Sequence, residues 1–383
     1  MTPQKILISF VALTAISANL FAQQEPFESD TSLAERIGII KQKQDNFQLY
    51  FHTHFSGDLL YDKNGLVNGA FRMPEIRIES QAKLTNRLSF RWRQRLNKNN
   101  KGSNNVDALP QSIDIAGLGI TLSEKWSLFI GKQCAAVGGF EFDLNPIEVY
   151  EFSNMGEYIN PYLTGIRAVY HPSARHEIQI EVLNSLNAPF ADNYPLVEEV
   201  QNAKLPFVYT VNWNGRMWDH FSTRWSYSFL PQGVKGSRHY NMHYIALGNQ
   251  LELGKAKSYF DIMYSNEGLN RKGIISNPYD VEYLSFVLEM RYAFKPQWQF
   301  FLKGMYETAG AKGSKRKSNT PLCYPLIMNS YGYSAGIEYY PLVGQNLHFF
   351  LTYVGRSHRH VDTRLSKDSH RASLGFIYQI PIF

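Results

Sequence analysis

The stretch FQLYFHTHFS, residues 47–56, alternates an apolar set of side chains with a more polar set. A period of two places alternate side chains on opposite faces of a pleated strand. The same alternation recurs at 87–93, 177–182 and 220–229. From residue 47 onward the sequence therefore predicts β-strands that carry one apolar face and one polar face.

Segments of this kind number sixteen, and the connections between them alternate between short and long. The predicted strands are 47–56, 69–83, 86–96, 111–122, 126–134, 162–171, 176–183, 207–214, 218–229, 237–250, 255–265, 281–294, 297–308, 331–341, 346–356 and 371–382. Long connections are expected at 57–68, 97–110, 135–161, 184–206, 266–280, 309–330 and 357–370, with 230–236 intermediate. Tight turns at one end of a meander and long loops at the other are typical of outer-membrane barrels. The sequence thus predicts an all-β, transmembrane, antiparallel up-and-down β-barrel of about sixteen strands, with short periplasmic turns and long external loops.

Composition narrows the class of protein further. The 383 residues include 14% aromatic and 19% charged side chains, and so many aromatic rings exclude a disordered chain. No apolar run of about 20 residues follows the N-terminus, which excludes a multi-span helical membrane protein. Aromatic residues such as Trp126 and Trp298 gather near strand ends, as in the girdles of membrane barrels. The net charge, 39 − 33 = +6, is small and dispersed, so no nucleic-acid partner is expected.

The N-terminus has the pattern of a secretory signal. Residues 1–22 combine one early lysine, Lys5, with a moderately apolar stretch and a small residue, Ala22, before Gln23. This pattern predicts a signal peptide over 1–22, a short periplasmic segment over 23–46 and the barrel over 47–383. Export and a membrane barrel together predict the outer membrane of a Gram-negative cell, with its lipids as partners.

A local motif lies around the third long connection. It reads GKQ at 131–133, GGFE at 138–141, NPI at 145–147 and YE at 150–151. With the strand pattern, it resembles the phosphate-selective porin O and P family. The resemblance implies a sixteen-stranded, usually homotrimeric channel for passive diffusion of small hydrophilic solutes and ions, without cofactor or catalysis. It also implies that residues 135–161 fold into the lumen and form its constriction.

Candidate pore-lining residues are of two opposite kinds. Four arginines share one face of the third predicted strand, and four more on other strands have the inward parity. The set is Arg87, Arg91, Arg93, Arg95, Arg77, Arg167, Arg224 and Arg291. Segment 135–161 has no lysine or arginine but carries Glu141, Asp143, Glu148, Glu151 and Glu157.

Two interpretations of these charges stay open. In the first, the basic wall faces the acidic segment across the constriction, and the resulting field orients polar solutes. In the second, neighbouring inward carboxylates such as Glu75, Glu79 and Asp114 neutralise the arginines as lumen salt bridges. Because bases and acids nearly balance, the sequence leaves open whether cations or anions such as phosphate are preferred.

The remaining motifs suggest other functions. GYSAG at 332–336 matches the nucleophile pattern of hydrolases, but it lies inside an alternating strand rather than at a strand-to-helix turn. A phospholipase-like barrel enzyme therefore stays an alternative to the non-enzymatic channel. A plugged structural or adhesive barrel is a second alternative, which electrical conductance would distinguish.

Two polar loops contain further candidate binding residues. Lys312, Lys315, Arg316 and Lys317 form a short basic run that suits anionic lipopolysaccharide better than nucleic acid. The last long connection contains His358, His360, His370, Asp362 and Asp368. Their spacing matches no metal site, so a solvated loop is expected and no metal is assigned.

Overall fold

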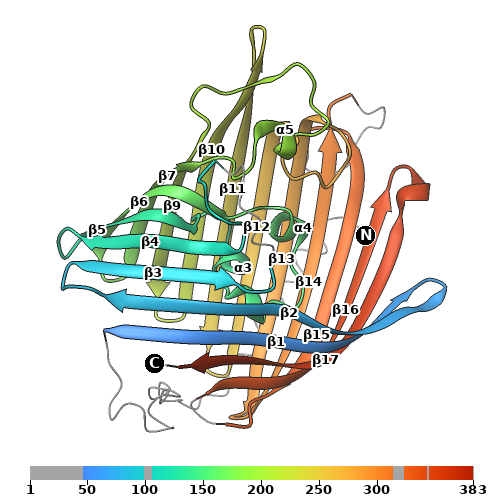
Figure 1. Ribbon diagram of the computed structural model, residues 1–383. Helices are drawn as coiled ribbons and strands as arrows, with labels where there is room; N and C mark the ends of the chain where they lie inside the picture. Colours follow the sequence, from blue (N-terminus) through green and yellow to red (C-terminus); the bar gives the residue numbers. More distant parts are fainter. Residues whose placement is uncertain (1–45, 99–105, 314–322, 343–344, 383) are drawn as a thin grey trace.

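A computed structural model describes residues 46–98, 106–313, 323–342 and 345–382. The predicted signal peptide, nearly all of segment 23–46 and Lys315 to Lys317 lie outside these residues. The chain folds into one antiparallel sheet that closes on itself (Figure 1). Closure is made by β1 (Phe47–Asp62), which pairs with β2 (Gly65–Lys83) on one side and with β17 (Lys367–Pro381) on the other.

Within the described residues, sixteen long strands form the barrel wall, which confirms the predicted fold. The others are β3 (Leu88–Arg95), β4 (Ile113–Thr121), β5 (Trp126–Cys134), β6 (Tyr162–Ser173), β7 (His176–Asn184), β9 (Phe207–Trp218), β10 (Phe221–Lys235), β11 (Arg238–Leu253), β12 (Ala256–Leu269), β13 (Tyr279–Lys295), β14 (Trp298–Ala311), β15 (Leu326–Tyr339) and β16 (Asn346–His360). A further strand, β8 (Gln201–Asn202), only adds a short pairing to β10. No helix in the described part of the chain has the length and apolarity needed to cross a membrane.

Three connections expected to be longer are replaced by extended hairpins. β1 and β2 are joined by residues 63–64, β10 and β11 by 236–237, and β16 and β17 by 361–366. The first two turns use Gly65 and Gly236, whose positive φ angles of 115° and 58° suit a glycine. Ladder pairs such as Gly57 with Phe71 show that the residues expected to form loops are paired backbone. The β10–β11 hairpin projects beyond its neighbours at the top of Figure 1.

Burial in this barrel is reversed relative to a soluble protein. Large apolar side chains are exposed on the outer face of the strands, among them Leu302, Leu351 and Leu374. Charged side chains such as Asp261 and Glu338 are buried on the inner face. Soluble proteins rarely expose large apolar patches or bury carboxylates. The outer face is therefore covered by lipid, and the inner face holds the polar lumen.

Aromatic rings mark two levels on the outer face. Near the short-turn end, Trp126 stacks on Tyr170 at 4.6 Å and Trp298 contacts Tyr339 at 4.7 Å between ring centroids. Towards the other end, Tyr306 lies 5.3 Å from a neighbouring tyrosine ring. Rings with one polar edge favour the membrane–water interface. The apolar band of β14 therefore runs from Trp298 to Tyr306.

Leu302 lies midway between these two levels, and its replacement by arginine should destabilise the barrel. An arginine at the lipid-facing midplane of a β-barrel costs about 2–4 kcal/mol. We expect the free energy of unfolding, measured by urea titration in lipid vesicles, to fall by that amount. Phe47→Arg is the matched control, because Phe47 begins β1 at the short-turn end. An equal loss at both positions would contradict this placement of the bilayer.

Candidate functional site

The segment between β5 and β6, residues 135–161, is called here the inner segment. It contains α3 (Phe140–Asp143), the 3-10 turn η1 (Pro146–Glu148) and α4 (Asn154–Glu157). Asp261 of β12 accepts hydrogen bonds from the backbone N–H groups of Phe140 and Glu141, at 2.9 and 2.7 Å. α3 and α4 are drawn within the ring of strands in Figure 1. The inner segment thus starts at β5 and contacts the wall opposite.

A buried charge pair joins the inner segment to β14. The ammonium group of Lys303 lies 2.6 Å from Glu141 Oε1 and donates to the Glu151 carbonyl at 2.8 Å. Glu141 also accepts hydrogen bonds from the N–H and Oγ of Ser153, at 2.9 and 2.5 Å. A buried carboxylate is tolerated when its oxygens are satisfied in this way. Lys303 and Glu141 together therefore hold two turns of the inner segment against the wall.

Apolar packing reinforces these polar contacts. Val137 and Met155 of the inner segment belong to one buried cluster with Met263 and Met305 of the wall, and Phe142 packs against it. This side of the lumen is thus a packed core rather than water. The open part of the lumen is confined to the remaining space.

Tyr150 fixes the far end of the inner segment. Its hydroxyl donates to Glu338 Oε1 at 2.8 Å, and its ring stacks on Phe301 with 5.0 Å between centroids. Burial, together with the Glu338 carboxylate, raises the pKa of Tyr150 well above its usual value. The phenol therefore stays protonated and remains a hydrogen-bond donor.

The acidic residues predicted in this segment have different partners. Asp143 pairs with Arg224 of β10 at 3.2 Å, and Glu148 accepts from Gln379 of β17 at 2.6 Å. Glu151 pairs with bases of β16 and β17, whereas the exposed Glu157 forms no ion pair with any described residue. Among the predicted arginines, only Arg224 forms an ion pair with the inner segment, although Arg77 donates to Asn145 at 3.1 Å.

The other predicted arginines pair with carboxylates of the barrel wall. The pairs are Arg77–Glu75 (2.5 Å), Arg91–Glu79 (2.8 Å), Arg93–Asp114 (3.7 Å), Arg95–Asp114 (2.7 Å), Arg167–Glu181 (2.5 Å) and Arg291–Glu289 (2.6 Å). Arg87 is exposed and lies just before β3. This arrangement favours the second interpretation of the arginines on β3, in which wall carboxylates neutralise them.

A second set of bases, which the predicted pore-lining residues do not include, lies on β16 and β17. Alternate residues of β16 are Arg356, His358 and His360, and alternate residues of β17 are Lys367, Ser369 and Arg371. We call these two rows the basic columns. His358 and Lys367 are directly paired across the strands. Alternation continues through 356–360 and 367–371, but the sequence predicts strands only to residue 356 and from residue 371, with a connection at 357–370.

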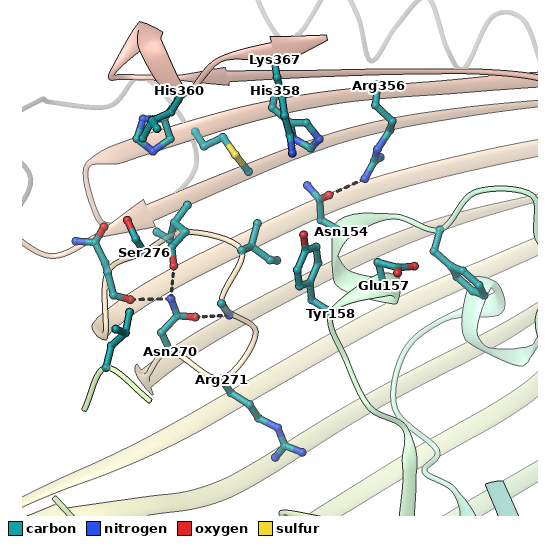
Figure 2. A pocket seen from close by; sticks show the side chains of 18 of the residues that line it. Asn154, Glu157, Tyr158, Asn270, Arg271, Ser276, Arg356, His358, His360 and Lys367 are labelled. Carbon is teal, nitrogen blue, oxygen red and sulfur yellow. Dashed lines mark hydrogen bonds between the residues drawn. The ribbon is translucent and has the colours of Figure 1, made fainter. Parts of the chain in front are cut away.

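The basic columns line a cavity of about 1010 Å³ at the long-loop end, called here the outer vestibule (Figure 2). Residues 149–158 of the inner segment, 193–197 and 270–278 form the other sides. Arg371 and Arg356 reach Glu151 at 3.2 and 3.5 Å. Neither Lys367 nor Arg271 forms an ion pair within the described ranges.

The charge of the vestibule lining is positive. Its charged side chains are Arg271, Arg356, Lys367 and Arg371 against Glu151 and Glu157, which gives 4 − 2 = +2 with histidines neutral. A concave surface of one sign raises the local concentration of counter-ions. The counter-ions of a lining with this charge are anions.

The hydrolase-like motif is not arranged as a nucleophile elbow. Ser334 is buried inside β15, and its neighbours across the strands are Lys303 and Val354. Its Oγ has no hydrogen-bond partner among the described residues. No group of three or more His, Cys, Asp or Glu side chains in that part of the chain could hold a metal ion.

Comparison with known proteins gives a family and a fold. The family described as phosphate-selective porin O and P matches residues 47–380. No curated protein matches the chain. Similar solved structures are Salmonella typhi OmpF in complex with daunomycin (14% identity, 87% of this chain and 98% of that chain, TM-score 0.59), an anion-selective porin from Comamonas acidovorans (8%, 87% and 99%, 0.57) and in-vitro folded OmpT of Vibrio cholerae in trimer form (10%, 88% and 100%, 0.54). At these identities the likeness shows the shared barrel fold.

Proposed function

The chain belongs to the phosphate-selective porin O and P family and is an outer-membrane porin of a Gram-negative cell, and we propose that it prefers small hydrophilic anions. The observation that carries this preference is the positive lining of the outer vestibule, with the basic columns on one wall. A charged lining selects ions by their sign before they reach the narrowest point. The barrel needs no cofactor for this passive diffusion.

The inner segment is the proposed constriction. Its contacts with β12, β14 and β15 fill one side of the lumen, which leaves the side towards β3 and β6 for solutes. Arg91 and Asp143 keep 43% and 56% of their side chains exposed, so both charges remain accessible to water. We propose that these two groups line the passage as members of the ion pairs Arg91–Glu79 and Arg224–Asp143.

Three further assignments are proposed with this function. A homotrimer in contact with outer-membrane lipids and lipopolysaccharide is the assembly that the family resemblance implies. The OmpT relative in trimer form supports it by analogy. Absence of catalysis is supported by the buried Ser334, which has no histidine as a cross-strand neighbour. Cleavage of the signal peptide at about residue 22 completes the proposal.

Reversal of one charge in the outer vestibule tests the anion preference. Lys367→Glu changes the lining from +2 to 0, because it removes one positive charge and adds one negative charge. We expect the anion-to-cation permeability ratio, measured as a reversal potential in a KCl gradient across planar bilayers, to fall clearly. Lys63→Glu is the control, because Lys63 lies in the β1–β2 turn outside the vestibule lining. An unchanged ratio in Lys367→Glu, or a wild-type preference for cations, would overturn the proposal.

A further inference from the structure

The outer vestibule has two chemically different sides. The basic columns form one side, whereas the facing sides contain apolar and aromatic residues at 194–197, 274–278 and Tyr158. Pockets that bury organic ligands typically measure about 300–1,000 Å³. The vestibule, at about 1010 Å³, lies at the upper end of that range. An inorganic ion would contact only the basic side.

The lining contains a buried donor without a partner. Asn154 is 4% exposed, and its Oδ1 accepts a hydrogen bond of 2.6 Å from Arg356 Nη2. Its Nδ2 has no partner among the described residues. Figure 2 shows Asn154 between Arg356 and Tyr158. Because a buried donor is costly when unsatisfied, Nδ2 points to an acceptor atom supplied by a ligand.

The protein already holds one carboxylate at the floor of the vestibule. Glu151 of the inner segment lies between Arg356 and Arg371 and stands in for an anionic ligand group there. Further along the columns towards the mouth, His358 and Lys367 are paired across the strands and have no carboxylate partner in the described residues. A second anionic group can therefore bind at Lys367 without displacing Glu151.

Tyr158 provides the matching contact for a ring. It follows α4 directly and is 51% exposed. The face of a tyrosine ring packs against apolar C–H surfaces. A sugar offers such a surface together with hydroxyl oxygens that accept from an amide donor. Lys367, Asn154 and Tyr158 are thus complementary to three parts of one small molecule.

We propose that the outer vestibule binds small anionic sugars, either sugar carboxylates or sugar phosphates. Lys367 contacts the anionic group, Asn154 Nδ2 donates to a sugar oxygen, and Tyr158 packs against the ring. This inference rests on the proposed anion preference and names a substrate class for the same channel. It explains the apolar side of the cavity, which anion attraction alone leaves without a role.

Block of the KCl current through single channels tests this inference. Glucuronate, glucose 6-phosphate, glucose and inorganic phosphate are added in turn on the long-loop side of the bilayer. We expect glucuronate or glucose 6-phosphate to block at lower concentration than both glucose and phosphate. Comparison of glucuronate with glucose 6-phosphate distinguishes recognition of a carboxylate from recognition of a phosphate. The inference would be overturned if phosphate or glucose blocked the current at the same concentration as the two anionic sugars.

The matched variant is Tyr158→Ala. Block by inorganic phosphate is the reference in this variant, because phosphate has no ring that packs against Tyr158 and no charge changes. Block by the anionic sugar should weaken about tenfold, the effect of one lost apolar contact in a pocket. An unchanged block contradicts the inference while leaving the anion preference intact. A cation-selective wild-type channel instead contradicts the proposed function, whatever the sugars do.

Discussion

Replacement of Lys303 by methionine should raise the single-channel conductance of the barrel. Lys303 is the cation that pairs with Glu141 inside the wall, and it also donates to the Glu151 carbonyl. Removal of one partner of a buried pair leaves the other charge unpaired and costs about 3–5 kcal/mol. The inner segment carries both contacts, so we expect it to leave the wall for part of the time. The lumen should then widen, and conductance in planar bilayers should rise and fluctuate.

A double variant separates loss of the pair from general damage to the barrel. Lys303→Met combined with Glu141→Gln removes both charges, so no unpaired ion remains buried. We expect its conductance to return towards the wild-type value. The effects of the two substitutions are then not additive, as is typical of residues in direct contact. Heat-modifiable migration on gels checks that each variant folds. Normal conductance in Lys303→Met alone would show that the pair does not hold the constriction.

The barrel itself could be predicted from sequence because its signal is local. Within the membrane, every second side chain of a strand contacts lipid, so the apolar period is visible in segments such as 298–306 of β14. The parity of short and long connections then indicated the topology. The family match over residues 47–380 confirms the resemblance indicated by the motif at 131–151. The alternation of a single strand does not identify a family.

The pattern failed where strands extend beyond the membrane. At the tops of β16 and β17 the outward side chains are polar as well, and Arg359 pairs with Asp368 at 2.9 Å. The contrast in polarity between the two faces of these strands therefore disappears, and the sequence pattern predicts a loop at 357–370. This error hid the basic columns, including the pairing of His358 with Lys367.

The partners of the inner segment could not be predicted for a different reason. Lys303 is 162 residues from Glu141 in the sequence, and nothing near either residue indicates the contact. The arginine-rich strand β3 was the strongest local feature. Its charges are nevertheless paired with Glu79 and Asp114 on adjacent strands. Strand pairing gives the neighbours of a residue, whereas the path of a long segment through the lumen depends on tertiary packing.

Glu151→Gln should strengthen anion binding in the outer vestibule. The Glu151 carboxylate lies 3.2 Å from Arg371 and 3.5 Å from Arg356, and the neutral amide would raise the lining charge from +2 to +3. A hydrogen bond to a charged group contributes about 1.5–3 kcal/mol, and the guanidinium group of Arg371 becomes available, whereas Arg356 stays paired with Glu307 at 3.2 Å. Each 1.4 kcal/mol is about tenfold in affinity, so we expect the anion current to saturate at about tenfold lower salt. The anion-to-cation permeability ratio should rise as well.

Glu157→Gln is the matched control, because it removes the same charge from the same cavity. Glu157 is exposed and forms no ion pair with the described residues, so its loss frees no arginine. Both variants should raise the permeability ratio through the long-range field, but only Glu151→Gln should change the concentration at which the current saturates. Equal saturation in the two variants would show that Arg371 serves the fold alone. A site created when Arg371 is freed from its own carboxylate predicts a difference that net charge cannot produce.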